Sequence, residues 1–453
     1  MNAAPTPSPP LSDLLAASAR CVAGVRAGRS LAELLPAVPA PLRPGTQALT
    51  FDALRRAGTA RALVRALAPR TPPPRVAALL EVALALLLQG TAYAAPTVVD
   101  QAVQALPALR APALRGFVNA CLRRFLRERE ALLAQARATT EGRWNHPAWW
   151  VQRLQIDHPL CWAEVLESDD TPAPLVLRVN RRRASRADVL ARLVLQGLSA
   201  EPIGTDGLVL AQAVPVAQLP GWNEGLVSVQ DGAAQLAAPL LLGAGLRPGA
   251  RVLDACAAPG GKTAHLLELA DIELWALDAD AQRIQRIHET LARLRLPAPG
   301  ASVQVRCADA GDPATWWDGR PFDAILLDAP CTASGIVRRH PDVRWLRRPG
   351  DVPRLAAQQG RLLQALWPLL APGGRLLYAT CSVFRAEGED VVAAFTRRQN
   401  GVQRLPAPGH LLPGGRAADA TAATQAQLAA YAMGDNARRG MDGFFYALLA
   451  KAG

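Results

Sequence analysis

Closely spaced cysteine pairs are missing from this sequence. Its seven cysteines stand at positions 21, 121, 161, 256, 307, 331 and 381, and none of them forms a C-x-x-C pair. An odd, scattered set does not fit the disulfide framework of a small secreted protein, and it lacks the ligand spacing of a structural zinc site. The pattern favours reduced thiols in a cytoplasmic protein and predicts no metal site.

The sequence also predicts neither a leader peptide nor a membrane-spanning run. Its first residues, MNAAPTPSPPLSD, have no basic start followed by an apolar stretch, so they do not fit a signal peptide. Residues 1–10 fit a short proline-rich disordered tail. The apolar run over residues 76–88 contains Glu81 and is too short to cross a bilayer. We interpret it as the central buried helix of a helical domain, and we expect no membrane partner.

Lysine is nearly absent, because Lys262 and Lys451 are the only two in the chain. Arginine therefore supplies almost all of the formal net charge of +12. A strongly basic chain favours an anionic partner such as nucleic acid. The chain is also rich in alanine, leucine and proline, which indicates a general compositional bias, so charge alone does not establish RNA binding. No heptad repeat or exposed apolar stripe indicates more than a monomer.

Hydrophobic periodicity divides the chain into segments of different character. Residues 11–140 have helical spacing, including a helix expected over 113–136. Residues 145–240 predict a small α+β module with a strand over 175–180, a helix over 186–196 capped by Ser185, and a hairpin turn at Asp206-Gly207. Residues 241–453 alternate strands with helices, which predicts a doubly wound, mostly parallel sheet. Its strands are expected over residues 251–255, 274–278, 303–307, 324–328 and 375–380.

A glycine-containing loop follows the first of these strands. The segment RVLDACAAPGGKTAHLLE, residues 251–268, reads as strand, loop and helix, with Pro259-Gly260-Gly261 at its centre. Glycines let the backbone approach a ligand, and the helix N-terminus offers free N–H groups. Asp278 ends the next strand, where an acidic residue can bind ribose hydroxyls. Asp309, after the third strand, is expected near the adenine end of the same ligand.

The same loop partly resembles the phosphate-binding loop of an NTPase. Gly261-Lys262-Thr263 matches the end of that motif, and Asp328 could pass for its magnesium aspartate. However, Cys256 stands where the motif requires its first glycine. A side chain there would hinder the tight backbone turn around a phosphate, so we set this alternative aside.

Two further strands end in cysteine motifs. FDAILLDAPCTASG, residues 322–335, carries Asp328 and Cys331, and LLYATCSV, residues 376–383, carries Cys381. Strand ends are where open α/β sheets place their chemistry. A carboxylate with two thiols indicates an enzyme that attacks a nucleic-acid base through a thiolate. Spacing alone leaves both cysteines as candidate nucleophiles.

The motifs DACAAPGGKT, DAPCTASG and YATCSV resemble those of the cytosine-C5 RNA methyltransferases. The continuation IVRRHPDVRWLRR narrows the resemblance to the small-subunit ribosomal RNA methyltransferase B family. GFVNACLRRFLRE, residues 116–128, is similar to the NusB-like RNA-binding domain of that family, and GMDGFFYALL, residues 440–449, to its closing strand. The departures, Ala255 for leucine and Thr332-Ala333-Ser334 for Ser-Ala-Thr, touch no charged or thiol position. The resemblance implies a NusB-like helical domain, a small α+β module and a Rossmann-like catalytic domain.

This resemblance implies methylation of cytosine C5 in small-subunit (16S) ribosomal RNA, with S-adenosyl-L-methionine as cofactor. It assigns Cys381 as the nucleophile, Cys331 to proton removal and product release, and Asp328 to N3 of the base, as a carboxylic acid kept protonated by burial. In the related DNA enzymes the Pro-Cys cysteine attacks, which would favour Cys331. The cofactor is expected to contact Cys256, Ala257, Ala258, Pro259, Gly260, Gly261, Lys262, Asp278, Asp309 and Asp328.

Several arginines are candidate RNA contacts. Arg338, Arg339, Arg344, Arg347 and Arg348 surround Trp345, a combination suited to phosphate contact and base stacking. The alternative is a loop packed by its tryptophan. The Arg181-Arg182-Arg183 strip and Arg123, Arg124, Arg127 and Arg129 are further candidates. Two other functions stay open: an RNA-binding protein with an inert methyltransferase fold, and an enzyme acting on transfer RNA or a protein.

Overall fold

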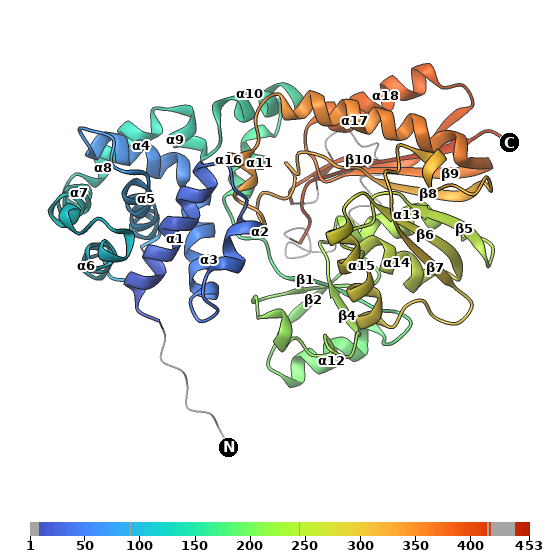
Figure 1. Cartoon of the computed structure of the whole chain (residues 1–453), viewed down its shortest axis with the longest axis horizontal. Coiled ribbons are helices and arrows are strands. Elements are labelled where there is room, and N and C mark those ends of the chain that lie inside the picture. Colours follow the sequence, from blue (N-terminus) through green and yellow to red (C-terminus); the bar gives the residue numbers. More distant parts are fainter. Residues whose placement is uncertain (1–8, 91, 244, 415, 418–439) are drawn as a thin grey trace. The chain divides into compact units, whose positions relative to one another are not determined.

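The structure is a computed structural model that describes residues 9–90, 92–243, 245–414, 416–417 and 440–453. Most of the predicted N-terminal tail, residues 1–8, lies outside the described part of the chain. The chain divides into two compact units. Unit 1 comprises Met1–Thr171 and Val337–Pro349, and unit 2 comprises Pro172–Ile336 and Gly350–Gly453. Figure 1 shows the order of the elements along the chain.

Unit 1 is helical, as its 3.6-residue periodicity predicts. The apolar run at residues 76–88 forms the central helix α5, whose Glu81 is buried and bound by Arg26 at 2.8 Å. In the described part of the chain, none of the helices is both long and apolar enough to span a membrane. The helices of this unit are α1 (Leu11–Arg26), α2 (Leu31–Leu34), α3 (Arg43–Arg55), α4 (Ala57–Leu67), α5 (Pro74–Gln89), α6 (Ala95–Gln104), α7 (Arg115–Arg127), α8 (Arg129–Arg137), α9 (Thr140–Trp144), α10 (Ala148–Asp157), α11 (Trp162–Asp169) and α16 (Val343–Leu346).

The prediction of a single helix over residues 113–136 is wrong. The chain turns at Glu128 and forms α7 and α8 instead. The reason is a tertiary contact: the Arg129 guanidinium donates to the backbone oxygen of Leu87 at 3.0 Å, near the end of α5, and lies over the Phe125 ring. A cation at a helix C-terminus satisfies carbonyls that have no partner within their own helix.

A short segment of the C-terminal half packs inside unit 1. This segment, Val337–Pro349, is called the returning segment below. Its Arg344 is fully buried and donates to an Asp170 carboxylate oxygen and to the Asp169 backbone oxygen, both at 2.6 Å. Trp345 packs against the helical core and donates its indole N–H to the Leu54 backbone oxygen at 2.8 Å. The returning segment is thus part of the core of the helical unit.

Unit 2 begins with a small antiparallel sheet in the order β2-β3-β1-β4. Its strands are β1 (Val176–Val179), β2 (Ala200–Ile203), β3 (Gly207–Leu210) and β4 (Val227–Val229). The predicted helix is α12 (Arg186–Leu195), and Ser185 caps it in a reciprocal capping box with Asp188. The predicted hairpin is confirmed, but its turn lies at residues 204–206 and not at Asp206-Gly207, because Gly207 already pairs with Ile203 as the first residue of β3.

The large sheet of unit 2 has the strand order β11-β10-β12-β9-β8-β5-β6-β7. Strands β5 to β9 pair in parallel, and β12, β10 and β11 extend the sheet in antiparallel fashion. The five strands predicted from the sequence are confirmed as β5 (Ala250–Asp254), β6 (Ile272–Asp278), β7 (Ser302–Cys307), β8 (Phe322–Asp328) and β9 (Leu370–Thr380). The other strands are β10 (Val402–Leu412), β11 (Arg416–Ala417) and β12 (Phe444–Lys451).

Both faces of this sheet are covered by helices. Successive strand residues alternate between two cores: Val252 packs with α13–α15, whereas Leu253 packs with α17 and α18. Figure 1 shows the two groups of helices on opposite sides of the sheet. Burial on both faces explains the nearly continuous apolar strands. The helices are α13 (Ala237–Leu242), α14 (Gly261–Leu269), α15 (Ala281–Leu294), α17 (Asp351–Leu366) and α18 (Glu389–Arg398).

Candidate active site

Several polar side chains stand where the parallel strands end. Asp254 ends β5, Asp278 ends β6, Asp328 ends β8, and Thr380 at the end of β9 precedes Cys381. The register pairs Asp328 with Ala379, so these ends lie at one edge of the sheet. This edge, where strand order reverses in doubly wound folds, is the expected place for a ligand.

A cavity of about 420 Å³ opens at this edge. It contains both cysteines of the strand-end motifs together with the predicted acidic residues. Its walls are formed by Ala255, Cys256, Ala258, Asp278, Ala279, Asp280, Arg283, Ala308, Asp309, Ala310, Asp328, Ala329, Pro330, Cys331, Ala333, Gln358, Leu362 and Cys381. Of the other predicted cofactor residues, Ala257, Pro259, Gly260, Gly261 and Lys262 form the loop and the first residues of α14 rather than the wall.

The loop after β5 owes its shape to one glycine. Gly260 adopts φ +95°, a left-handed conformation that side chains disfavour, directly before α14. No side chain caps this end of the helix. The loop is secured from the other side, since the Ala258 N–H donates to an Asp278 carboxylate oxygen at 3.1 Å. The result is an open helix N-terminus held next to an acidic residue.

Two carboxylates form the acidic side of the cavity. Asp278 is buried and lies 3.5 Å from the guanidinium of Arg283, which also donates to the Ala258 backbone oxygen at 2.7 Å. Asp309 pairs with Arg361 at 3.1 Å. Carboxylates along the wall of a cavity are suited to accept hydrogen bonds from the hydroxyl and amino groups of a nucleoside.

Asp254 and Cys256 lie deeper beside this wall. Burial raises the pKa of Asp254 to about 7, against the lowering influence of the hydrogen bond from Thr263. The Asp254 Oδ1 atom has no hydrogen-bond partner among the described residues. Burial also raises the pKa of Cys256, so its side chain stays a neutral thiol. An open helix end, two acidic groups and a roomy cavity fit a nucleoside-type cofactor with a positive charge.

The two strand-end cysteines meet in the cavity. The Sγ atoms of Cys331 and Cys381 are 3.4 Å apart. Backbone contacts hold the two segments together, because the Gly335 N–H donates to the Cys381 oxygen at 3.0 Å and the Gly443 N–H donates to the Gly335 oxygen at 2.8 Å. A Cβ atom on Gly335 would lie only 2.0 Å from the Gly443 oxygen. The closing motif at residues 440–449 therefore packs directly against the Cys331 segment.

Asp328 is paired with one of the two lysines of the chain. The Lys262 Nζ atom lies 2.6 Å from an Asp328 oxygen and 5.3 Å from the centre of the Phe444 ring. Burial alone would lower the pKa of Lys262, but the Asp328 carboxylate outweighs it and the pKa is raised. The expectation that burial encloses Asp328 is wrong, because Asp328 has an ammonium partner and is partly exposed. Together the two groups offer an acceptor and a donor to a ligand.

Sequence reasoning missed the helical part of the wall. Arg283 on α15 and Gln358 and Leu362 on α17 line the cavity, but no local motif marks them. Glu387, which contacts the segments of both cysteines, was also missed. Glu387 follows the YATCSV motif in the sequence, so a charged residue shortly after Cys381 was the available signal.

The interpretation of residues 338–348 as an RNA-contacting arginine cluster is wrong for its central members. Arg338, Arg344 and Trp345 are held within unit 1, with Arg344 completely buried. Arg61 stacks over the Trp345 ring at 4.2 Å, so the aromatic face is already occupied. The alternative of a loop packed by its tryptophan is the correct one.

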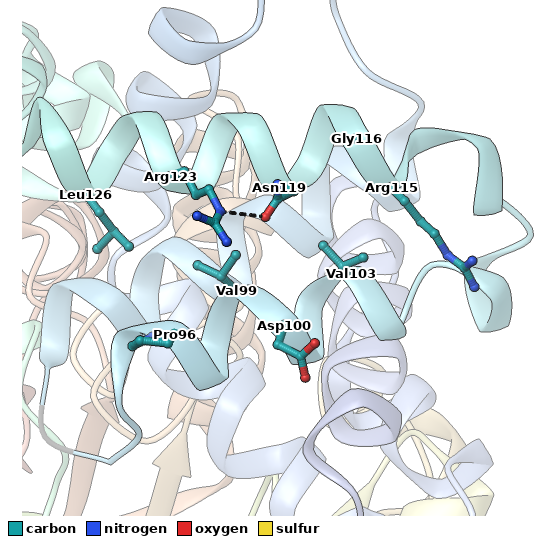
Figure 2. Close-up of a pocket in the computed structure, with 9 residues that line it drawn as sticks. All are labelled: Pro96, Val99, Asp100, Val103, Arg115, Gly116, Asn119, Arg123 and Leu126. Atoms are coloured by element: carbon teal, nitrogen blue, oxygen red, sulfur yellow. Dashed lines mark hydrogen bonds between the residues drawn. The ribbon is translucent and has the colours of Figure 1, made fainter.

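The arginines on α7 and α8 are divided between packing and an open surface. Arg129 binds α5, and Arg124 pairs with Glu128 at 2.9 Å. Arg123 instead donates to the Asn119 side chain at 3.1 Å beside a hollow of about 600 Å³ between α6 and α7. Figure 2 shows this hollow, with Arg123 and Arg115 on its α7 side and apolar residues of α6 opposite.

The sheet, the cavity and its cysteines fit the methyltransferase class, and comparison with known proteins shows that class. A family model described as "16S rRNA methyltransferase RsmB/F" matches residues 244–450, and one described as "Methyltr_RsmF/B-like, ferredoxin-like domain" matches residues 146–217. A solved methyltransferase homolog from Pyrococcus horikoshii has 26% identity and a TM-score of 0.54, covering 69% of this chain and 97% of that one.

Two curated relatives extend the match over nearly the whole chain. The ribosomal RNA small subunit methyltransferase B of Xanthomonas campestris is 42% identical and covers 100% of both chains. The protein of the same name from Vibrio cholerae is 39% identical and covers 94% of each. The chain belongs to the ribosomal RNA small subunit methyltransferase B family.

Proposed function

We propose that this enzyme methylates C5 of a cytosine in small-subunit ribosomal RNA through a covalent bond between Cys381 and C6 of the base. The observation that carries the proposal is the pair of thiols, 3.4 Å apart, in one cavity with Asp328. The names of the curated relatives supply the RNA class. The proposal includes a monomer that needs no metal. It also places the protein in the cytoplasm, because thiol chemistry of this kind requires reduced cysteines.

The cofactor is S-adenosyl-L-methionine. The residues that would hold it are Asp278 and Asp309, through the ribose and base, and the loop from Cys256 to Lys262 with the open end of α14. When bound, this cofactor supplies an electrophilic methyl group on a sulfonium. The acidic wall suits its positive charge, and the orphaned Asp254 Oδ1 atom lies behind the same loop.

Cytosine C5 needs activation before it can attack a methyl group. A Cys381 thiolate adds to C6, which makes C5 an enamine-like carbon. Negative charge then develops toward N3 and O2, where the Lys262–Asp328 pair can donate a proton or hydrogen bond. After C5 has formed its new bond to carbon, a base removes the C5 proton, the C5–C6 double bond re-forms, and the Cys381 sulfur leaves. Because the base must enter the cavity, it has to leave its RNA stack.

Substitution of the two cysteines tests the proposal. Cys381→Ala should reduce methyl transfer to unmodified small-subunit RNA by at least about a thousandfold, because it removes the proposed attacking thiolate and the neighbouring Cys331 is assigned to the later proton removal. Cys331→Ala should instead accumulate a covalent RNA–protein adduct, since attack remains possible while release is impaired. Incorporation of labelled methyl groups and a denaturing gel report the two outcomes.

Cys307→Ala is the matched control, because Cys307 is an exposed cysteine at the end of β7 and does not line the cavity. It should retain wild-type activity. If the wild-type enzyme transfers no methyl group to this RNA, the proposed substrate is wrong. If Cys331→Ala abolishes transfer without an adduct and Cys381→Ala remains active, the roles of the two thiols are reversed.

A further inference from the structure

Glu387 lies between the two cysteine segments and binds both. It ends the short 3-10 helix η8 (Arg385–Glu387) and its side chain is buried. Its Oε1 atom accepts from the Thr332 N–H at 2.8 Å, and its Oε2 atom accepts from the Ser382 hydroxyl at 2.7 Å and from the Thr332 hydroxyl. Thr332 directly follows Cys331, and Ser382 directly follows Cys381.

The surroundings of Glu387 fit an ionised carboxylate. A fourth donor, the Gln359 side-chain amide of α17, reaches Oε1 at 3.3 Å, and the same amide donates to the Pro330 oxygen at 2.9 Å. Burial raises the pKa of Glu387, while the bonds from Thr332, Ser382 and Gln359 oppose that rise. A carboxylate oxygen accepts hydrogen bonds only, so four converging donors match its charged form.

The charges around the two thiols are of opposite sign. On the Cys331 side, the hydrogen bond with Cys381, burial, and the negative charges of Cys381 and Glu387 raise the pKa of Cys331 well above its usual value. On the Cys381 side stands Lys262. Burial lowers the pKa of Lys262, but Asp328 and a negative Cys381 together raise it. An ammonium stabilises a neighbouring thiolate, and a carboxylate destabilises one.

The remaining titratable neighbour of Cys331 carries no charge. Burial and the negative charges of Cys331 and Glu387 raise the pKa of Tyr378 well above its usual value, so its hydroxyl stays protonated. That hydroxyl donates to the Glu387 backbone oxygen at 2.8 Å and lies 3.1 Å from the Gln359 side-chain oxygen. Tyr378 of β9 and Gln359 of α17 thus contribute neutral groups, and Glu387 contributes a negative side chain that contacts the Cys331 segment.

We infer that Glu387 is a positioning residue: its hydrogen bonds hold the Cys331 and Cys381 segments together, and its negative charge stands on the Cys331 side, so that the two thiols act in order. This inference rests on the proposed function and adds an order to its two thiols. Cys381, on the side of Lys262, attacks first, and Cys331, on the side of Glu387, acts second.

The order gives a balanced reaction. When the Cys381 sulfur bonds to C6, it becomes a neutral thioether and a weak hydrogen-bond acceptor. The negative charge of Cys381 and its hydrogen bond with Cys331 are then lost, and these are two of the influences that raise the pKa of Cys331. The Cys331 thiol then releases its proton to solvent and its sulfur takes the C5 proton. Re-formation of the C5–C6 double bond expels Cys381 as a thiolate, and both cysteines return to their starting states. One proton is released for each methyl group transferred.

The test is the pH dependence of thiol alkylation in the full-length protein alone. Brief labelling with iodoacetamide between pH 6 and 11.5, kept to less than one label per molecule, is read at each cysteine by mass spectrometry. In the wild type, Cys381 should label at a lower pH than Cys331. In Glu387→Gln, the Cys331 midpoint should fall by about half a unit to one unit, because one nearby negative charge is removed.

Two further variants separate charge from packing. Glu389→Gln, two residues along and paired with Arg404 at 2.6 Å, should leave both midpoints unchanged. Thr332→Val removes one hydroxyl donor but keeps the charge, so it should leave the Cys331 midpoint in place. Methyl transfer by Glu387→Gln should show kcat lowered about 10- to 100-fold with KM for RNA within about twofold, the pattern of a misplaced reacting group.

Several results would overturn the inference. The first is that Cys331 labels before Cys381 in the wild type. The second is that the pH midpoint of Cys331 labelling is unchanged in Glu387→Gln. The third is that this midpoint falls as far in Thr332→Val as is expected for Glu387→Gln. If Glu387→Gln does not fold, the wild-type order still tests whether Cys331 acts second, and labelling first at Cys331 would overturn the inference. Because labelling needs neither RNA nor cofactor, a failure to methylate ribosomal RNA would contradict the proposed function while leaving the thiol order measurable.

Discussion

Asp254 and Asp328 end neighbouring strands, yet their surroundings differ completely. Asp254 is fully buried and its partner is the Thr263 hydroxyl. Asp328 is partly exposed and faces the Lys262 ammonium. The sheet therefore places one carboxyl group beneath the loop after β5 and another on the wall of the cavity, and of these two Asp328 is the one hydrogen-bonded to the Lys262 ammonium.

The buried Asp254 should make stability depend on pH. Its folded-state pKa of about 7 lies above the ordinary value of 3.8. Below the lower value the group is protonated in both states. As the pH rises toward 7, the unfolded state ionises and the folded state does not, so folding stability falls. Between pH 5 and 8 this group should cost the wild type about 1–3 kcal/mol, a loss that Asp254→Asn should not show.

Urea unfolding at pH 5, 6.5 and 8 measures this difference. The relevant quantity is the change in the free energy of unfolding between pH 5 and 8, compared between the variant and the wild type. Asp312→Asn, at an exposed position, serves as the control and should follow the wild type. An Asp254→Asn protein with the same pH slope as the wild type would contradict the predicted titration.

Individual elements show where sequence patterns carry information. The parallel strands could be predicted, because strands buried on both faces are mostly apolar and here end at Asp254, Asp278 and Asp328. The break between α7 and α8 could not, since it depends on Arg129 reaching carbonyls of α5. Arg344 likewise appeared to be a surface residue, because its partners Asp169 and Asp170 lie far away in the sequence.

The candidate site divides in the same way. Residues in the strand-end motifs, such as Cys331, Cys381 and Asp278, line the cavity as expected. Residues contributed by helices, such as Arg283 and Gln358, were not predicted. A helix residue reaches the cavity only because of how its helix packs on the sheet, and its own neighbours in sequence give no sign of that.

Gly335 of the Cys331 segment packs against Gly443 of the closing motif, and this contact between two elements yields a prediction. Gly335→Ala should destabilise the protein by about 1–3 kcal/mol and reduce methyl transfer, because the new Cβ atom would lie 2.0 Å from the Gly443 oxygen. Backbone must move to relieve that contact, and the Cys381 segment is bonded to the same residue. Thermal unfolding and a methyl-transfer assay give the two readouts.

Gly360→Ala is the matched comparison, because it should raise the stability of the protein where Gly335→Ala lowers it. Gly360 lies within α17, and a Cβ atom there would have open space around it. This change should stabilise the protein by roughly 0.5–1 kcal/mol, since alanine loses less backbone entropy in a helix. A Gly335→Ala enzyme as stable and active as Gly360→Ala would show that the close approach is not required.

At the scale of the whole molecule, the net charge of +12 should control binding of the RNA substrate. The affinity for a labelled fragment of small-subunit RNA should fall about tenfold or more between 50 and 200 mM salt, because arginines that bind phosphates release counterions. Fluorescence anisotropy measures the affinity at each concentration. A neutral osmolyte such as sucrose should have little effect, and an affinity independent of salt would rule out phosphate contacts as its main source.

The returning segment has a consequence for how the protein is made. The chain leaves unit 1 after Thr171 and re-enters it at Val337. During synthesis, the helical unit therefore emerges from the ribosome first but cannot complete its core until Arg344 and Trp345 have followed. Until then, the acceptors of Arg344 at Asp169 and Asp170 remain unmatched. The two units are expected to reach their final form together, although one of them is translated long before the other.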